Sequence, residues 1–418
     1  MSVAPLLRGI TGDVPLWRCL TLMGAVLALP EASAWPQGVP LGPEFRINTY
    51  TTANQFLPSL GSDAAGNFVV VWAGYDQDGS GSGVFGQRLA NGGVPLGPEF
   101  LVNTYTTGDQ FSPAIAVDGS GRFVVVWASN EDGSSYGIVG QRYDSAGVPL
   151  GPAFLVNTDT VGAQYSPAVA SAPSGDFVVV WSKGVALGIA GQRYSATGAP
   201  LGAEFQVNTS TGCPNSPDVA VDGSGNFTVA WTDEIRFGGS CPFATSGILA
   251  QRYAASGSPL GPEFRVNSTT AGFQLQPSVA ASAAGDLIVV WAGSGVTGQR
   301  FLGSGAPAGL EFQVGAGASP AAAMDGAGDF VVVWTGGDGS SYGVLGQRYA
   351  GSGPPSGTTF RVNTYTTSSQ TAAAVASEPG GRFVVAWSSN GQDGSNYGVF
   401  GQRYAEIVPV ELMDFVVD

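Results

Sequence analysis

The sequence predicts an all-β protein, a seven-bladed β-propeller built from four-stranded antiparallel blades. Three observations lead to this prediction: a pattern of about fifty residues that recurs seven times, four short strand signals within each copy, and a suitable composition. The 418 residues include 64 glycines and 27 prolines, with 44% hydrophobic and only 11% charged residues. Apolar strands separated by many tight turns explain this composition, whereas a disordered chain would have fewer core-forming side chains.

The most recognisable part of each copy is an apolar strand that ends in tryptophan, such as residues 123–127 with the sequence FVVVW. Both alternating sets of side chains in this strand are apolar, so both faces are expected to be buried between neighbouring sheets. The tryptophans are therefore assigned to the core. They are Trp72, Trp127, Trp181, Trp231, Trp291, Trp334 and Trp387.

Three further strand signals surround the tryptophan strand. In the second complete copy they are residues 112–117 before it, residues 137–143 after a glycine-rich loop, and residues 154–157 after a Gly/Pro turn. Four strands in about fifty residues fit one blade, and propellers usually have roughly 4 to 8 blades. A β-solenoid is the alternative, although its coils are usually shorter.

A recurring arginine near the end of the third strand is predicted to be structural in every copy. Each is expected to brace its own blade, through a glutamate of the adjoining strand or through backbone carbonyls, because two copies lack the glutamate. The candidate glutamates are Glu99, Glu204, Glu263 and Glu311, and the arginines are Arg88, Arg142, Arg193, Arg252, Arg300, Arg348 and Arg403.

The strand centred on phenylalanine occurs eight times against seven tryptophan strands, which predicts a ring closed by a terminal strand. The surplus copy is either residues 43–48 or the strand around Phe415. Phe415 follows Arg403 at the same distance as Phe100 follows Arg88, so both alternatives stay open.

The start of the chain predicts a secretory signal peptide over residues 1–34. Two arginines precede an uncharged run at 19–29, and the small residues 32–34 follow, which is the order typical of such a peptide. A membrane anchor is the alternative, but the run is shorter than the about 20 residues that a span needs. Residues 35–418 are predicted to form one secreted or cell-surface propeller domain, monomeric and without a membrane span.

Composition excludes several classes of function. The net charge of −15 repels phosphate backbones, so nucleic acid is not expected as a partner. The chain has no histidine, which excludes Ser-His and Cys-His nucleophile pairs and histidine-ligated zinc sites. The remaining catalytic option of note is a pair of carboxylates about 5–10 Å apart, as in glycosidases.

A ligand-binding face is predicted on the loops between second and third strands, because these loops differ most between copies. Asp76-Gln77-Asp78-Gly79 resembles the start of a calcium loop, but the distal glutamate of an EF-hand is missing. Such sequences also form tight turns without metal, so no cofactor is predicted and calcium is left open. Tyrosines in nearby connections offer stacking surfaces for sugars or peptides. The predicted face consists of Asp76, Asp78, Asp132, Asp233, Glu234, Asp338, Asp393, Tyr50, Tyr105 and Tyr365.

Two cysteines remain beyond the predicted signal peptide, and an exported chain allows one bridge between them. Cys213 lies in the connection into the first strand of the fourth copy, and Cys241 lies in the longest loop of that copy. In an up-and-down blade both emerge on the same face. A Cys213–Cys241 disulfide is therefore predicted, with two free thiols as the alternative.

The repeat resembles units of large bacterial exported proteins, including some hemolysin-type calcium-binding and surface proteins. The resemblance rests on the Phe-Val-Val-x-Trp, Asp-Gly-Ser, Gly-Gln-Arg-Tyr and Glu-Phe-x-Val-Asn-Thr motifs over residues 37–405. It implies the type of repeat and a bacterial exported context, but no particular activity. The glycine-rich nonapeptide calcium coil of those proteins is absent from this sequence.

The leading functional prediction is a non-catalytic binding or scaffold protein that recognises a glycan or a protein through its loop face. A carboxylate-dependent glycan-cleaving enzyme is the first alternative. A structural repeat module of the envelope or matrix is the second, although unequal loops count against it.

Overall fold

The computed structural model describes residues 38–405 except 134, 185–187, 211, 235–244, 352 and 379. The chain divides into two units, residues 1–34 and residues 35–418. The predicted signal peptide lies outside the described residues. No helix in the described part is long and apolar enough to cross a membrane.

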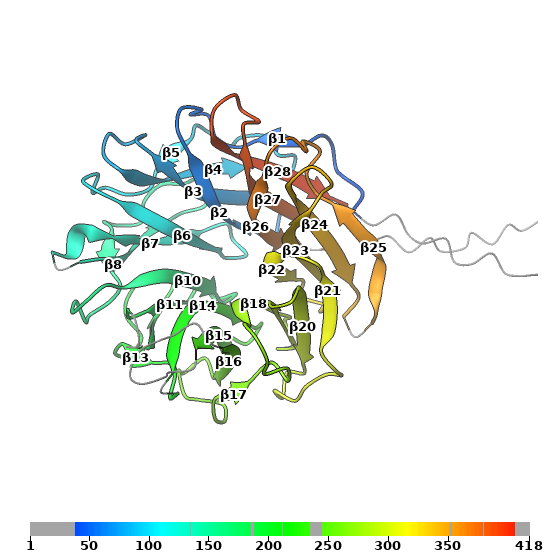
Figure 1. Ribbon diagram of the computed structural model, residues 1–418. Coiled ribbons are helices and arrows are strands. Elements are labelled where there is room, and N and C mark those ends of the chain that lie inside the picture. The colour runs from blue at the N-terminus through cyan, green and yellow to red at the C-terminus, as the bar shows by residue number, and fades with distance from the viewer. Residues whose placement is uncertain are drawn as a thin grey trace, which may run out of the picture. The chain divides into compact units, whose positions relative to one another are not determined.

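Seven separate four-stranded antiparallel sheets form the fold, and they are arranged as a ring around a central axis (Figure 1). From inner to outer strand, blade 1 consists of β2 (Gln55–Ser62), β3 (Phe68–Tyr75), β4 (Ser82–Leu89) and β5 (Phe100–Leu101), and blade 2 of β6 (Gln110–Val117), β7 (Phe123–Ser129), β8 (Gly137–Tyr143) and β9 (Phe154–Leu155). Blade 3 consists of β10 (Tyr165–Ser171), β11 (Phe177–Ser182), β12 (Ile189–Tyr194) and β13 (Phe205–Gln206), and blade 4 of β14 (Cys213–Val221), β15 (Phe227–Glu234), β16 (Ser246–Tyr253) and β17 (Phe264–Arg265). Blade 5 consists of β18 (Leu275–Ala281), β19 (Leu287–Ala292), β20 (Val296–Phe301) and β21 (Phe312–Gly315), and blade 6 of β22 (Ala318–Met324), β23 (Phe330–Gly337), β24 (Tyr342–Tyr349) and β25 (Pro355–Arg361). Blade 7 consists of β26 (Gln370–Ser377), β27 (Phe383–Asn390), β28 (Tyr397–Tyr404) and β1 (Phe45–Arg46). A 3₁₀ helix, η1 (Asn130–Asp132), follows β7. The predicted fold class is confirmed.

The hydrophobic core lies between blades and is divided among the seven interfaces. At the interface of blades 2 and 3, Val124 and Val126 of one blade pack with Val179 and Trp181 of the next. All side chains of β7 and β11 are buried, because each of these strands is covered by a neighbouring sheet on both sides. The seven repeat tryptophans are at most 2% exposed.

The N-terminal strand closes the ring. β1 pairs with β28, so the fourth strand of blade 7 comes from the start of the chain (Figure 1). Backbone hydrogen bonds extend this seam, from Leu41 N to Arg403 O at 2.8 Å and from Ile47 N to Val399 O at 2.8 Å. The competing strand around Phe415 lies outside the described residues.

Every inner strand contains a bulge at which a residue other than glycine adopts a left-handed φ. The seven bulge residues have φ between 49° and 53°, a conformation that costs about 1–3 kcal/mol for each such residue. Together with the residues beside them they line the central channel, whose volume is 550 Å³. They are Leu57, Ser112, Ser166, Ser216, Gln276, Ser319 and Ala372.

The recurring arginines connect each blade to the next, mainly through backbone carbonyls, which were one of the two predicted kinds of acceptor; the prediction that they brace only their own blades through glutamates is corrected. Arg88 Nη2 of blade 1 donates to Ser145 O of blade 2 at 2.7 Å, and Arg193 Nη1 of blade 3 donates to Ala255 O of blade 4 at 2.5 Å. The glutamates instead accept from the connection of the preceding blade, as Glu99 Oε2 accepts from Thr49 N at 2.6 Å. The physical reason is the length of the arginine side chain. It spans the gap between two sheets, so its guanidinium group can donate to turn carbonyls that are free to accept a hydrogen bond.

Replacement of one bracing arginine is expected to weaken the ring. In Arg193→Met, the loss of the bonds to Ala255 O and Leu201 O should lower the unfolding free energy by about 1–2 kcal/mol, measured by denaturant titration. Arg46→Met is the control, because the exposed Arg46 has no such bond within the described residues. Equal stability of the two variants would contradict the bracing role.

Candidate functional site

One end of the blades, called the loop face here, carries the loops between second and third strands together with the connections between blades. The two kinds of segment touch there: Ser82 N donates to Asp109 Oδ1 at 3.0 Å, and Gly108 N donates to Ser80 Oγ at 3.1 Å. The sequence-predicted site residues lie in these segments or at the strand ends beside them.

Three of the six predicted aspartates, Asp78, Asp338 and Asp393, accept hydrogen bonds from their own loops. Asp338 Oδ1 accepts from Ser340 N and Ser341 N, each at 3.0 Å, and Asp393 Oδ1 accepts from Ser395 N at 3.1 Å. Asp78, Asp76 and Asp132 lie in corresponding loops, Asp76 at a φ of 56° and Asp132 in η1. The described residues contain no group of three or more metal-ligating side chains. Calcium binding stays an untested alternative.

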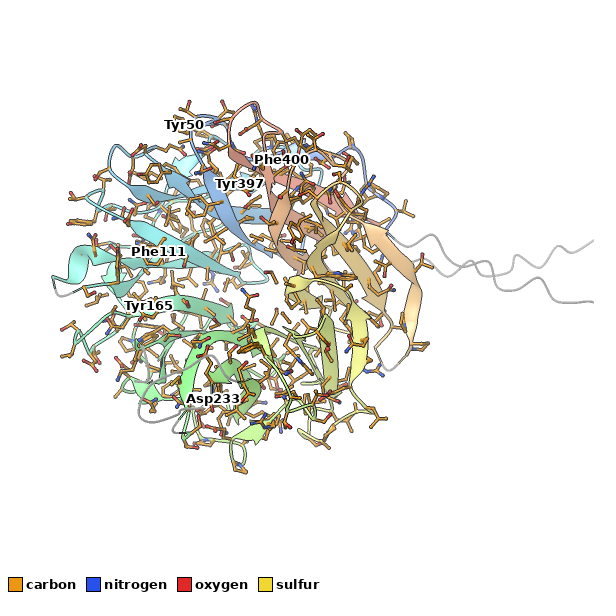
Figure 2. The ribbon with its side chains drawn as sticks, in the orientation of Figure 1. Tyr50, Phe111, Tyr165, Asp233, Tyr397 and Phe400 are labelled. Carbon is orange, nitrogen blue, oxygen red and sulfur yellow. The ribbon has the colours of Figure 1, made fainter. Side chains whose placement is uncertain are left out.

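The predicted tyrosines lie in three connections at one side of the ring, those that lead into blades 1, 2 and 7. An asparagine two residues earlier fixes each of them, because its Nδ2 donates to the tyrosine carbonyl of Tyr50, Tyr105 or Tyr365 at 2.7, 2.9 and 2.7 Å. Asp233 lies across the ring in blade 4 (Figure 2). The structure therefore does not gather the predicted residues into one site.

Blade 4 brings together two acidic side chains that the repeat pattern did not predict as a pair. Asp233, near the end of β15, lies close enough to Glu263, which directly precedes β17, for the charge of Glu263 to raise its pKa. A side chain at Gly212 would collide with the carboxyl group of Asp233, so this glycine leaves room for it. Glu234 was predicted beside Asp233, but successive strand residues point to opposite faces, and Glu234 is buried against Asn215.

Blade 3, which precedes blade 4, has a lysine at the position that corresponds to Asp233. Lys183, two residues after its tryptophan as Asp233 is, lies with Nζ 3.9 Å from Glu204 Oε1 and 3.1 Å from Asp159 Oδ2. Glu204 corresponds to Glu263 in the repeat. Blade 3 therefore has a lysine and a glutamate where blade 4 has two carboxyl groups, and this contrast is the signal in the sequence that could have identified the pair.

Backbone donors hold Glu263 in place. Its Oε2 accepts from Thr209 N at 2.7 Å, Thr209 Oγ1 at 3.2 Å and Ser210 N at 3.4 Å. Asp233 Oδ1, in contrast, is buried and accepts no hydrogen bond from the described residues. Burial and the nearby charge of Glu263 raise the pKa of Asp233 from its usual 3.8 to about 6. At mildly acidic pH Asp233 therefore keeps its proton.

This raised pKa predicts a pH-dependent change in stability. The folded state binds the Asp233 proton more tightly than the unfolded state, so the unfolding free energy should fall as pH rises from about 4 to about 6. Asp233→Asn removes this effect and should be more stable than the wild type at pH 7.5 by on the order of 1 kcal/mol, and equally stable at pH 4. Denaturant titration at both pH values measures this difference.

The control variant is expected to change in the opposite direction. A backbone hydrogen bond from Val161 and the charge of Lys183 lower the pKa of Asp159, so Asp159→Asn should not stabilise the protein at pH 7.5. Stabilisation by both substitutions would contradict the assignment of the effect to the Asp233 pair.

Cys213 lies at the start of β14, where it is 3% exposed and aligned with Glu234. Cys241 lies outside the described residues, so the Cys213–Cys241 disulfide stays a prediction.

The central channel has a single carboxylate among its lining residues, Asp218. Its Oδ2 accepts from Val279 N of blade 5 at 2.8 Å, and its Oδ1 accepts from Val219 N at 2.9 Å. Burial raises the pKa of Asp218. With both oxygens bound to backbone amides, Asp218 joins two inner strands, and the described lining of the channel lacks the second carboxylate that a catalytic pair requires.

No protein-family model matches the chain, and comparison with curated proteins gives no match. Among solved structures, the chain is similar to a protein of unknown function from Dyadobacter fermentans, with a TM-score of 0.55 and 10% identity over 88% of this chain and 98% of that chain. It is also similar to an α-L-arabinofuranosidase of Fusarium graminearum, with a TM-score of 0.48 and 12% identity over 71% and 94%. An α-L-arabinanase of Penicillium chrysogenum has a TM-score of 0.47 and 13% identity over 87% and 98%.

These neighbours correct the prediction of a non-catalytic binding protein. Several of them are glycan-cleaving enzymes, so the non-catalytic prediction is not kept, and the alternative, a carboxylate-dependent glycan-cleaving enzyme, is left as a proposal. The prediction was wrong because a chain without histidine and with recurring acidic turns can still catalyse through carboxyl groups. At these identities the likeness shows the fold alone, so any catalytic role must be argued from this chain's own carboxyl groups.

Proposed function

We propose that the protein is a glycan-cleaving enzyme that uses the carboxyl groups of Asp233 and Glu263. The observation that carries this proposal is that Asp233 lies near the recurring glutamate Glu263, whereas blade 3 has Lys183 at the corresponding position and the other blades have Gly or Ser. A structural role would favour an opposite charge or an amide near the glutamate, as Lys183 provides for Glu204 in blade 3 and Gln77, from another position of the loop, provides for Glu99 in blade 1. Two facing carboxyl groups destabilise a fold and are typical of sites that exchange protons.

The two carboxyl groups suit different steps of glycoside hydrolysis. Asp233, with its pKa raised to about 6, keeps its proton in mildly acidic solution and can donate it to the oxygen of the leaving group. Glu263, oriented by three donors of the connection from blade 3, can act as the nucleophile or as the base that activates water. The charge of the exposed Arg265 lowers the pKa of Asp233, but the larger effects of burial and of Glu263 outweigh it.

The experiment is a screen for reducing ends. The whole protein is incubated at about pH 5 with a panel of neutral and acidic polysaccharides, and newly formed reducing ends are measured. We expect release from at least one polymer by the wild type and none above background by the double variant Asp233→Asn, Glu263→Gln. Equal release by the wild type and the double variant, or no release from any polymer, would refute the proposal.

A further inference from the structure

The turn face, defined here as the end of the blades opposite the loop face, carries pockets at the junctions of neighbouring blades. Three successive junctions have equivalent pockets of different size: 20 Å³ between blades 2 and 3, 110 Å³ between blades 3 and 4, and 10 Å³ between blades 4 and 5. The same repeat positions line all three, among them the phenylalanine that begins the second strand and the bracing arginine. A change of individual side chains must therefore explain why the middle pocket is larger.

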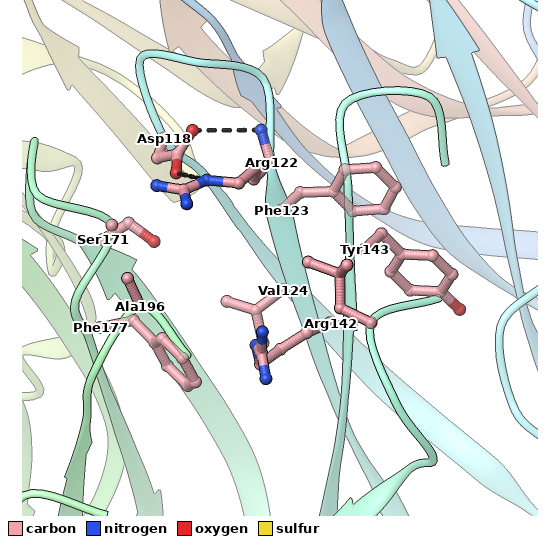
Figure 3. Close-up of a pocket in the computed structure, with 11 residues that line it drawn as sticks. Asp118, Arg122, Phe123, Val124, Arg142, Tyr143, Ser171, Phe177 and Ala196 are labelled. Carbon is pink, nitrogen blue, oxygen red and sulfur yellow. Dashed lines mark hydrogen bonds and ion pairs between the residues drawn. The ribbon is translucent and has the colours of Figure 1, made fainter. Parts of the chain in front are cut away.

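In the two small pockets a turn aspartate takes up part of the junction. Between blades 2 and 3, Asp118 Oδ1 accepts from Ser120 N at 2.9 Å, and Asp118 Oδ2 lies 2.8 Å from Arg122 Nε (Figure 3). Between blades 4 and 5, Asp222 has the same position and accepts from Ser224 N at 2.8 Å. Each aspartate thus holds its turn and lines the pocket at once.

Blade 3 has Ala172 at this position, whereas the other six blades have a polar side chain. Those six residues are Asp63, Asp118, Asp222, Ser282, Asp325 and Glu378. A second lining position also varies, but it does not explain the difference in volume, because Asp176 of blade 3 and Asn226 of blade 4 have the same size. The missing carboxyl group at residue 172 therefore accounts for the larger pocket.

Apolar side chains form the wall of this larger pocket. Ala172, Phe177 and Phe227 are buried and line it together with Val221. An apolar cavity of about 150 Å³ holds a benzene molecule, so a pocket of 110 Å³ admits roughly four to six non-hydrogen atoms. A methyl group would find apolar contacts here, where the neighbouring pockets have a carboxylate.

Two polar side chains of the same pocket can hold a hydrogen-bonding group. Arg193 donates to Ala255 O at 2.5 Å and to Leu201 O at 2.9 Å, and its other N–H groups have no partner among the described residues. Asp176 Oδ1 accepts from Ala196 N at 2.8 Å, while its Oδ2 accepts no hydrogen bond from the described part of the chain. Because Arg193 and Asp176 have opposite charges, the pocket suits an uncharged group that both accepts and donates.

We propose that the pocket between blades 3 and 4 binds the acetamido group of an N-acetylated sugar. In this arrangement the methyl group packs on the apolar wall, the carbonyl oxygen accepts from Arg193, and the N–H donates to Asp176. The sugar ring stays at the mouth of the pocket, where the exposed Leu201 offers an apolar surface to its face and the exposed Ser224 a hydroxyl to its edge. The site lies at the end of the blades opposite the Asp233 pair and does not rest on the proposed catalysis.

The experiment compares N-acetylglucosamine with glucose, because the two sugars differ only by the acetamido group. Each is titrated into the whole protein carrying Asp233→Asn and Glu263→Gln, so that the result is independent of the catalytic pair, and binding is followed by saturation-transfer NMR. We expect saturable binding of N-acetylglucosamine with a Kd on the order of 1 mM and at least about tenfold weaker binding of glucose. Ala172→Asp restores the aspartate of the neighbouring blades and should lower the affinity for N-acetylglucosamine at least about tenfold.

Two further variants make the test specific. Ser282→Asp introduces aspartate at the same repeat position of blade 5 and should leave binding unchanged. Ala172→Asn fills the pocket without adding a charge and should weaken binding as Ala172→Asp does, with thermal unfolding as the check that each variant is folded. Absence of saturation, equal binding of glucose, or unchanged affinity in both residue 172 variants would overturn the proposal. Tighter binding of N-acetylglycinamide than of N-acetylglucosamine would overturn the assignment to a sugar and indicate an acetylated peptide.

Discussion

Removal of residues 1–48 is expected to open the propeller and to lower its melting temperature by at least about 10 °C, or to prevent folding. The deletion takes away β1, the only strand of blade 7 that comes from the start of the chain. It uncovers one side of β28 and removes Ile47, which is 3% exposed, from the core between blades 7 and 1.

The size of this effect follows from the packing and the hydrogen bonds that the deletion removes. Burial of Ile47 and of much of Phe45 contributes about 1.5–3 kcal/mol each, and the seam loses backbone bonds such as Ile47 N to Val399 O and Leu41 N to Arg403 O, each worth about 1 kcal/mol. The sum is a large part of the about 5–15 kcal/mol that stabilises a typical domain.

A shorter deletion is the control for this prediction. Removal of residues 1–37 leaves every described residue of the seam in place and should leave the thermal transition unchanged, measured by circular dichroism or calorimetry. The longer deletion should also associate, because β28 becomes an unpaired edge strand. A shift of only a degree or two after removal of residues 1–48 would show that the ring does not depend on β1.

The second large effect is expected on catalysis. On a polymer that the wild type cleaves, Glu263→Gln should lower kcat about 10²- to 10⁴-fold, because the amide can act neither as nucleophile nor as base. Asp233→Asn should cause a loss of similar size, since the amide has no acidic proton to donate. The activity of the wild type should decline above about pH 6, where Asp233 loses its proton.

Glu204→Gln is the matched control for the catalytic pair. Glu204 occupies the same repeat position as Glu263 and is held by the same kind of bonds, from Thr158 N and Thr158 Oγ1, but it faces Lys183. Its replacement should leave kcat within about a factor of two, because it disturbs only a structural contact near the surface. Equal losses for Glu204→Gln and Glu263→Gln would assign both residues to the scaffold.

The fold was predictable because its signals recur. Seven tryptophan strands with two apolar faces require cover on both sides, and this requirement favours a ring of sheets over separate sandwiches. The eighth phenylalanine strand also indicated terminal closure, but the sequence could not choose between residues 43–48 and Phe415, because both preserve the repeat spacing.

The candidate site was less predictable. Asp233 could be identified as an exception in the repeat, yet its partner Glu263 is a recurring residue and was assigned to the scaffold with the other glutamates. Only the folded structure brings the charge of Glu263 close to Asp233, while Glu234, the neighbour of Asp233 in sequence, is buried against Asn215. Backbone carbonyls were one of the two acceptors that the sequence left open for the arginines, but it did not indicate that they would belong to the next blade, about sixty residues further along the chain for Arg88 and Arg193.

At the bulges of the inner strands, the backbone conformation around the pore is the same in every blade while the side chains that form its wall differ. Leucine, serine, glutamine and alanine all adopt nearly the same φ there, so the backbone alone determines how closely the blades approach the axis. Substitutions at these positions can therefore alter the polarity and the free space of the pore while the backbone frame around it stays the same.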